Sequence, residues 1–485
     1  MIRNRDALAT SHAREVALDC VTAGIEAARP DRVVAETVTR DGDTLGVAPP
    51  GVSGSAGASP VTVDLAEPAE VVVLGGGKAA AGVAAALEPV LGDALDGGLV
   101  VTDTPVETDR VAVREGDHPV PTERNVVATR DLLERAGACT GDTLVIAPLT
   151  GGASALLAAP AAGLTLADLR DTTAALLESG ADIGEINAVR KHCSAIKGGR
   201  LARAVAPARL VTLALSDVVG DDLSVIGSGP TVPDPSTYGD AVGVLEDFAV
   251  GVPDAVRSHL ERGATGDAPE TPKPGDPAFE RASARVVASN ATALAAARRA
   301  VPSEYDVAVL SSRFEGEARH LAGPHVAVAA EAVATGNPLS PPAVFLSGGE
   351  ATVAVTGDGE GGPNQEFGLA AAIELAYGAV PGVGGDDATA RPDHGDAVGG
   401  ARAGAEEVVV AAVDTDGRDG ATDAAGALVD RETLAPDGGT TGDRSAARAA
   451  LAANDVTPFL ADRGALVETG RTGTNVNDLR VVVVR

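Results

Sequence analysis

The sequence VVVLGGGKAAAGVAAAL, residues 71–87, decides the fold. Its apolar run Val71–Leu74 is typical of a buried strand, and the alanine-rich run Ala79–Leu87 is typical of a helix. Glycines join the two, so the backbone can approach a ligand closely while the first N–H groups of the helix face that ligand. We predict an anion-binding loop made of Gly75, Gly76, Gly77 and Lys78.

The same loop permits other interpretations. Gly75, Gly77 and Ala80 also match the dinucleotide fingerprint, and Asp103 follows the next predicted strand, where an acid can bind a ribose. The spacing differs from that of a Walker A loop. A tight turn that packs a helix on a sheet is a third interpretation. The stretch alone therefore does not separate a nucleotide kinase from a dehydrogenase.

Two later segments repeat the glycine sequence. A second strand–glycine–helix unit at 143–158 has at its junction Thr150, Gly151, Gly152 and Ser154. A predicted strand at 343–355 contains a similar sequence, Ser347, Gly348, Gly349 and Glu350. This alternation predicts an α/β fold, with a Rossmann-like, doubly wound, mostly parallel sheet and a second, smaller α/β domain. We expect the first domain at residues 1–255, a connecting segment at 256–340, the second domain at 341–485, and within it a glycine- and aspartate-rich insertion at 379–404.

The composition limits the partners. The chain carries 69 acidic and 38 basic residues, and its net charge of −31 argues against nucleic acid as a partner. Such a charge suits the salt-filled cytoplasm of a halophile. The N-terminus lacks an apolar signal core, and no apolar run approaches the ~20 residues of a membrane span, so we expect a cytoplasmic protein. Three widely spaced cysteines indicate neither a disulfide framework nor a zinc site.

Basic residues stand out in so acidic a chain, and lysine occurs only at positions 78, 191, 197 and 273. The segment 186–204 contains Arg190, Lys191 and Lys197 and no acidic residue. We predict a helix that ends at Gly198-Gly199, with Arg190 and Lys197 on one face, and a phosphate or carboxylate site there. A basic face paired with neighbouring carboxylates is the alternative. His118, in an X-Pro turn, is a candidate for contact with a ligand, although a solvated side chain is the favoured interpretation.

Several polar residues follow predicted strands. Asp217 comes after the strand 209–215 and is a candidate base or metal ligand. Asp414 and Asp416, with Asp419 close by, can hold a Mg²⁺ ion that keeps several of its waters. The remaining candidates for ligand binding are Asn364 and Gln365, at the start of an alanine-rich helix, and Asn475, before the last strand.

Together the strings VLGGGKAA, GDHPVP, LTGGASALL, INAVRKHCSAIKGGRLA, DTDGRDGATDAAGA and TGTNVNDL resemble the glycerate 2-kinase family with a C-terminal MOFRL domain. With its acidic composition, the chain looks like a halophilic, haloarchaeal member. The resemblance covers residues 5–484 and implies ATP- and Mg²⁺-dependent phosphorylation of D-glycerate to 2-phosphoglycerate in a cleft between two domains. Glycerate and ATP would be its small-molecule partners, and a homodimer is left open.

The resemblance also suggests roles. Lys78 would face the transferring phosphoryl group or the glycerate carboxylate, and Arg190, Lys191 and Lys197 would form an anion-binding wall. In one departure, the family's usual arginine is replaced by Pro363, and we hypothesise that Arg418 substitutes for it. An unchanged rate in Arg418→Ala would rule this out. The alternative activity is an NAD(P)H-dependent hydroxypyruvate reductase, which the dinucleotide interpretation of the first loop would permit.

Overall fold

A computed structural model describes residues 1–51, 60–377, 407–434 and 441–485, so the expected insertion at 379–404 lies outside the described residues. The chain divides into two compact units. The parallel-sheet unit consists of Ala28–Ser289 and Gly473–Val476, and the mixed-sheet unit consists of Met1–Ala27, Asn290–Thr472 and Asn477–Arg485.

The parallel-sheet unit is built on six strands. In spatial order they are β6 (Val111–Glu115), β5 (Gly97–Thr102), β4 (Glu70–Gly76), β7 (Thr143–Thr150), β8 (Arg209–Leu215) and β9 (Ala282–Ala288), and all neighbours are parallel. The predicted doubly wound sheet is therefore confirmed. The chain order reverses between β4 and β7, which makes this the switch point where ligands of such sheets usually bind.

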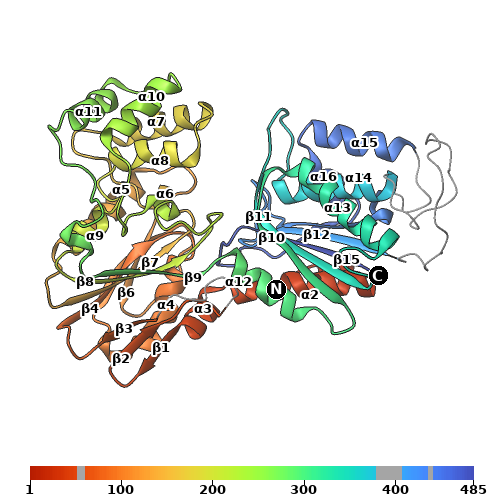
Figure 1. Cartoon of the computed structure of the whole chain (residues 1–485), viewed down its shortest axis with the longest axis horizontal. Coiled ribbons are helices and arrows are strands. Elements are labelled where there is room, and N and C mark those ends of the chain that lie inside the picture. The colour runs from red at the N-terminus through yellow and green to blue at the C-terminus, as the bar shows by residue number, and fades with distance from the viewer. Residues whose placement is uncertain (52–59, 378–406, 435–440) are drawn as a thin grey trace. The chain divides into compact units, whose positions relative to one another are not determined.

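Helices cover both faces of this sheet. One face carries α3 (Pro30–Thr37) and α4 (Ala80–Leu91), and the other carries α5 (Glu123–Gly137) and α9 (Arg200–Val205). A separate small core joins α7 (Leu166–Glu178), α8 (Ile183–His192), α10 (Tyr238–Asp247) and α11 (Asp254–Ala264), which gather on one side of the sheet in Figure 1. A small antiparallel sheet is formed by β1 (Val38–Asp41), β2 (Thr44–Val47) and β3 (Val61–Asp64).

The mixed-sheet unit also has a six-stranded sheet. Its order is β10 (Asp306–Glu317), β11 (Ala343–Thr352), β15 (Asp478–Val484), β12 (Val408–Asp414), β13 (Gly426–Asp430) and β14 (Leu466–Val467), of which only β10 and β11 pair in parallel. On one face lie α13 (Ala318–Thr335), α14 (Pro363–Tyr377), α15 (Thr441–Ala452) and α16 (Val456–Ala461), and on the other lie α2 (His12–Ala27) and α12 (Asn290–Ala300) (Figure 1). The N-terminal helix α2 thus packs on this sheet, with β15 and β12.

One local expectation was wrong. Helix α8 ends at His192 instead of at Gly198-Gly199, because Cys193 leaves the helical conformation and Ser194 pairs with Pro160 in an isolated β-bridge. The strand predicted to contain the third glycine segment is confirmed, since β11 runs through Gly348 and Gly349 to Thr352. There Gly349 has φ 126°, and a Cβ would lie 2.1 Å from the carbonyl oxygen of Phe314 on β10. That glycine serves close packing of two strands.

None of the helices within the described ranges combines the length and the apolar composition that a membrane crossing requires.

Candidate functional site

Two glycine loops meet at the switch point of the parallel sheet. The backbone N–H of Lys78, after β4, donates to the carbonyl oxygen of Gly151, after β7, at 2.8 Å. The next N–H, of Ala79, donates to the Thr150 hydroxyl at 3.0 Å. A Cβ on Gly77 would lie 2.2 Å from that hydroxyl oxygen, so only glycine permits this approach. The two loops therefore interlock at the carboxyl ends of β4 and β7.

The first loop does not provide the predicted amide cradle. Its N–H groups at Gly77, Lys78 and Ala79 donate to protein acceptors, the first of them to the Val101 carbonyl at 3.0 Å. Gly75 and Gly76 are the last residues of β4, and a Cβ on Gly75 would lie 2.1 Å from the Pro148 carbonyl oxygen. These glycines permit tight packing, as in the third interpretation of the sequence. The loop contributes the Lys78 side chain and leaves no N–H group between Gly77 and Ala79 for a phosphate.

The second loop has N–H groups to offer. Within the described residues, no protein atom accepts a hydrogen bond from the backbone N–H of Gly152, Ala153 or Ser154. Gly152 has φ 79°, and a Cβ on it would lie 3.0 Å from Lys78 Cγ and 3.1 Å from His118 Cδ2. Both basic side chains therefore lie beside these N–H groups. Oriented N–H groups beside a lysine side chain are suited to an anion.

The side chains of Asp217 and Asn475 lie against Gly151, the residue that precedes Gly152 in the same loop. A Cβ on Gly151 would be 2.2 Å from Asp217 Oδ2 and 3.0 Å from Asn475 Nδ2. The Asn475 amide donates to the same carboxylate oxygen at 3.5 Å. Asp217 follows β8, the strand beside β7, which explains why it comes to this edge. The loop thus has a carboxylate against Gly151 and the side chains of two basic residues against Gly152.

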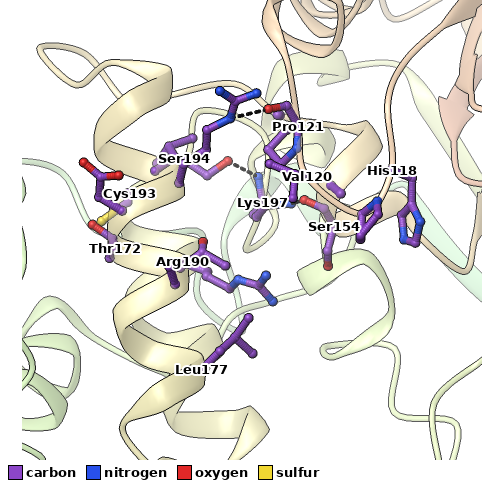
Figure 2. Close-up of a pocket in the computed structure, with 18 of the residues that line it drawn as sticks. His118, Val120, Pro121, Ser154, Thr172, Leu177, Arg190, Cys193, Ser194 and Lys197 are labelled. Carbon is purple, nitrogen blue, oxygen red and sulfur yellow. Dashed lines mark hydrogen bonds between the residues drawn. The ribbon is translucent and has the colours of Figure 1, made fainter. Parts of the chain in front are cut away.

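A cavity of about 530 Å³ opens beside this loop (Figure 2). Its walls come from residues 118–121, from α6 (Ala153–Leu156), and from α7 and α8. Gly152, Ser154 and His118 belong both to the loop region and to the cavity wall. The Ser154 hydroxyl lies 2.9 Å from the Ser228 hydroxyl. The loop and the cavity therefore form one continuous site.

Arg190 and Lys197 bring positive charge to the cavity. Figure 2 shows the Arg190 guanidinium extending into it, and among the described residues no acceptor lies within hydrogen-bonding distance of that group. The Lys197 ammonium donates to the Ser154 carbonyl at 2.6 Å. Burial, and then the charge of Arg190, lowers the pKa of Lys197 to about 7, and burial also lowers the pKa of Arg190. Two cations that repel each other here favour an anionic ligand.

Lys191 does not join this wall, unlike its neighbour Arg190. Its ammonium lies 3.1 Å from the Asp234 carboxylate, and the two side chains are only 6% and 0% exposed. Although burial raises the pKa of Asp234, Lys191 and Ser236 bring that pKa below its ordinary value. The pair is a buried structural ion pair. Adjacent helical residues point about 100° apart, so one of two neighbouring cations can reach the cavity while the other faces the core.

In the mixed-sheet unit, Asn364 and Gln365 bind another protein residue. Their backbone N–H groups donate to the two carboxylate oxygens of Asp419 at 2.9 and 2.8 Å, at the start of α14. Asp419 thereby caps this helix. Burial raises the pKa of Asp419 to about 7 despite these hydrogen bonds. This acid is therefore a helix cap, and it is unavailable as a third ligand beside Asp414 and Asp416.

The remaining candidates of this unit lie near one end of its sheet. Asp414 and Gly349 both pair in register with Asp478, and Glu350 is the next, exposed residue of β11. On β11, the Ser347 hydroxyl lies 2.7 Å from His325 Nε2, and a Cβ on Gly348 would collide with the Asn290 side chain.

After β12, the backbone N–H of Asp416 donates to Asp414 Oδ1 at 2.9 Å. The Arg418 guanidinium donates to the Thr422 carbonyl oxygen at 3.3 Å.

For His118, contact with a ligand was the less favoured of the two interpretations of the sequence. A histidine in an X-Pro turn is usually solvated, and the only available signal was the rigid turn itself. Its position depends on the connection between β6 and α5 reaching Gly152, which no local pattern reveals.

Two family models match this chain. A domain of unknown function, DUF4147, matches residues 16–261, and the MOFRL family matches residues 343–478. A protein of Agrobacterium vitis, provisionally named as a hydroxypyruvate reductase, is 40% identical over 420 residues, which cover 85% of this chain and 87% of that protein.

Similarity to glycerate kinases extends over nearly the full length. The glycerate 2-kinase of Pyrococcus horikoshii is 35% identical over 483 residues and covers 97% of both chains. The crystal structure of a glycerate kinase from Thermotoga maritima matches with a TM-score of 0.75 and 32% identity, over 97% of this chain and 99% of that one.

Proposed function

Because this chain belongs to the glycerate 2-kinase family, we propose that it transfers the γ-phosphoryl group of ATP to the C2 hydroxyl of D-glycerate. One observation carries the proposal beyond the family. Consecutive glycines of one loop, Gly151 and Gly152, have the Asp217 carboxylate against the first and Lys78 with His118 against the second. Phosphoryl transfer needs such an arrangement, in which a proton acceptor and positive charge flank the reacting groups.

The chemistry follows from these groups. The C2 oxygen forms a bond to the γ-phosphorus, the bond from that phosphorus to the β,γ-bridging oxygen breaks, and ADP leaves. Asp217 accepts the hydroxyl proton, and Asn475 orients the carboxylate. Lys78 and the N–H groups from Gly152 to Ser154 stabilise the charge on the transferring group. Arg190 and Lys197 hold further negative charge of the substrates.

Mg²⁺ bound to a nucleotide takes only one or two carboxylates from a protein and keeps several waters. The described residues contain no cluster of three or more His, Cys, Asp or Glu side chains that could hold a metal ion. An ion that arrives bound to the nucleotide needs only one or two carboxylates from the protein. We propose that Asp414 and Asp416 supply them. When bound, the ion would neutralise charge on the donor phosphates. Arg418 as the substitute for the missing arginine stays a hypothesis.

The test is an enolase-coupled assay, which responds to 2-phosphoglycerate and not to 3-phosphoglycerate. We expect turnover with ATP and D-glycerate, and a loss of about 100-fold or more in kcat for Lys78→Ala, because a preorganised charge contact is removed. Lys273→Ala is the matched control, since Lys273 binds Ser236, Thr271 and Glu270 away from the loop. Near-normal turnover of Lys78→Ala would refute the assignment.

A reductase is the second candidate because of the name of the Agrobacterium vitis relative. The occupied N–H groups of the first loop weigh against it, since a dinucleotide pyrophosphate would need them. We expect no loss of NADH absorbance with hydroxypyruvate. If NADH were oxidised at a rate comparable to the kinase rate, the reductase would become the favoured function.

We further propose that the acidic surface adapts a cytoplasmic enzyme to concentrated salt, as the net charge of −31 suggests. The expected result is a free energy of unfolding that rises from low salt to molar KCl.

A further inference from the structure

The lining of the cavity does not suit glycerate. Every carbon of glycerate carries an oxygen, whereas much of the wall is apolar, with side chains from Val120, Ala155, Ala158, Leu169 and Leu177. Hydroxyl groups against such a wall would lose their hydrogen bonds to water without replacement, which costs free energy. At about 530 Å³ the cavity also falls in the range typical of sites for much larger ligands.

The charge of the cavity points to a polyanion. Arg190 and Lys197 both line it, and neither has a carboxylate within ion-pairing distance among the residues that the structure describes. A single carboxylate would balance only one of them. A nucleoside triphosphate supplies several negative charges together with a flat ring, and a guanidinium can bind phosphate or stack on such a ring.

The residues at the mouth of the cavity also favour a nucleotide. Val120 is 56% exposed and Leu177 is 65% exposed, and both belong to the few large apolar side chains that the described surface leaves so accessible. They lie on different segments, the β6–α5 connection and α7, and both line the cavity (Figure 2). A flat, weakly polar ring placed between them would remove apolar area from water.

We propose that this cavity binds the nucleoside of the phosphoryl donor, with the base against Val120 and Leu177 and the phosphates directed toward Arg190, Lys197 and the Gly152 loop. The proposal rests on the proposed kinase function. The cavity would then hold the donor, ATP, and the acceptor, glycerate, would bind outside the cavity, beside Gly151 and Asp217.

The test uses two tryptophan variants of the full chain. Ala174 is exposed on α7 and lines the cavity, whereas Ala167 is exposed on the same helix and does not. In Ala174→Trp the indole would occupy the mouth, so we expect the Kd for ADP with Mg²⁺, measured by calorimetry, to rise about tenfold or more. Ala167→Trp should bind ADP as the unaltered protein does. The chain has no other tryptophan, so the fluorescence of the indole in Ala174→Trp also reports binding in the cavity.

Kinetics separate the donor from the acceptor. In Ala174→Trp we expect KM for ATP to rise while KM for D-glycerate stays within about twofold. A raised KM for glycerate with an unchanged Kd for ADP would overturn the proposal, and so would equal effects of the two tryptophans. If the unaltered protein binds ADP but makes no phosphoglycerate, the kinase function fails while the binding comparison still decides the cavity.

Arg190→Met provides an independent arm. No protein group depends on Arg190 for a hydrogen bond in the described part of the chain, so its removal leaves no buried partner unpaired. We expect the Kd for ADP to rise about 10- to 100-fold, as for a lost charge-assisted contact, with little change in the Kd for adenosine. A general distortion of the cavity would weaken both ligands equally, and that result would contradict the role of Arg190.

Discussion

Gly152→Ala tests whether Lys78 and His118 must lie where the second glycine loop permits. Gly152 has φ 79°, so an alanine there costs about 1–2 kcal/mol of folding free energy in backbone strain. Its Cβ would also lie 3.0 Å from Lys78 Cγ and 3.1 Å from His118 Cδ2. Carbon atoms prefer separations of about 3.5–4.0 Å, so these side chains must shift by roughly 0.5–1 Å. Misplacement of that order costs about 100-fold in rate.

Gly163→Ala is the matched control. Gly163 has φ 87°, nearly the same backbone conformation, but a Cβ on it would meet nothing within 4 Å. Chemical unfolding should show a similar loss of about 1–2 kcal/mol in both variants, because the backbone strain is shared. Only Gly152→Ala should lose kcat in the enolase-coupled assay. If both variants retain the full rate, or both lose it equally, the reasoning about the position of Lys78 is wrong.

The remaining predictions concern buried charges. Burial raises the pKa of Asp419 from 3.8 to about 7, so between these pH values the folded state holds more protons and stability falls as pH rises. Relative to Asp419→Asn, the unaltered protein should lose roughly 3 kcal/mol of unfolding free energy from pH 4 to pH 7, and parallel pH profiles would contradict this. Lys191→Met leaves Asp234 buried without its cation and should cost about 3–5 kcal/mol of stability, with kcat of the folded enzyme unchanged. A fall in kcat without a loss of stability would show instead that Lys191 acts in the active site.

The parallel sheet was predictable because its signals are local. The apolar runs before Gly75 and Gly151 are short and uninterrupted, and an alanine-rich segment follows each of them. Buried parallel strands with crossover helices require this alternation, so the strand order confirmed what the pattern indicated. The segment at Ser347 shares the apolar run and the glycines, but EATVAV follows them, and the segment lies in a strand with an antiparallel neighbour, β15. That neighbouring strand is encoded more than 100 residues later, so the local pattern could not predict the antiparallel pairing.

The candidate site was predictable only where residue type and strand position agreed. Lys78 and Asp217 both follow buried strands of one parallel sheet, whose carboxyl ends meet at one edge. Lys191 and Asp419 were predicted as ligand-binding residues, but the structure gives each of them a protein partner. Each is satisfied by a partner distant in sequence, Asp234 in one case and the start of α14 in the other. Whether the fold supplies a charged residue with such a partner is not information that a local pattern carries.

The two glycine loops show how this principle decides the location of an anion site. Both follow a buried strand, and their sequences predict the same N–H geometry. Yet the Thr150 hydroxyl and the Gly151 carbonyl accept the N–H groups of Ala79 and Lys78, so the first loop is saturated by the second. The second loop receives no such acceptors for Gly152 and the two residues that follow within the described structure. An anion is therefore expected where the N–H groups are unsatisfied, and Lys78 serves that loop from the neighbouring one.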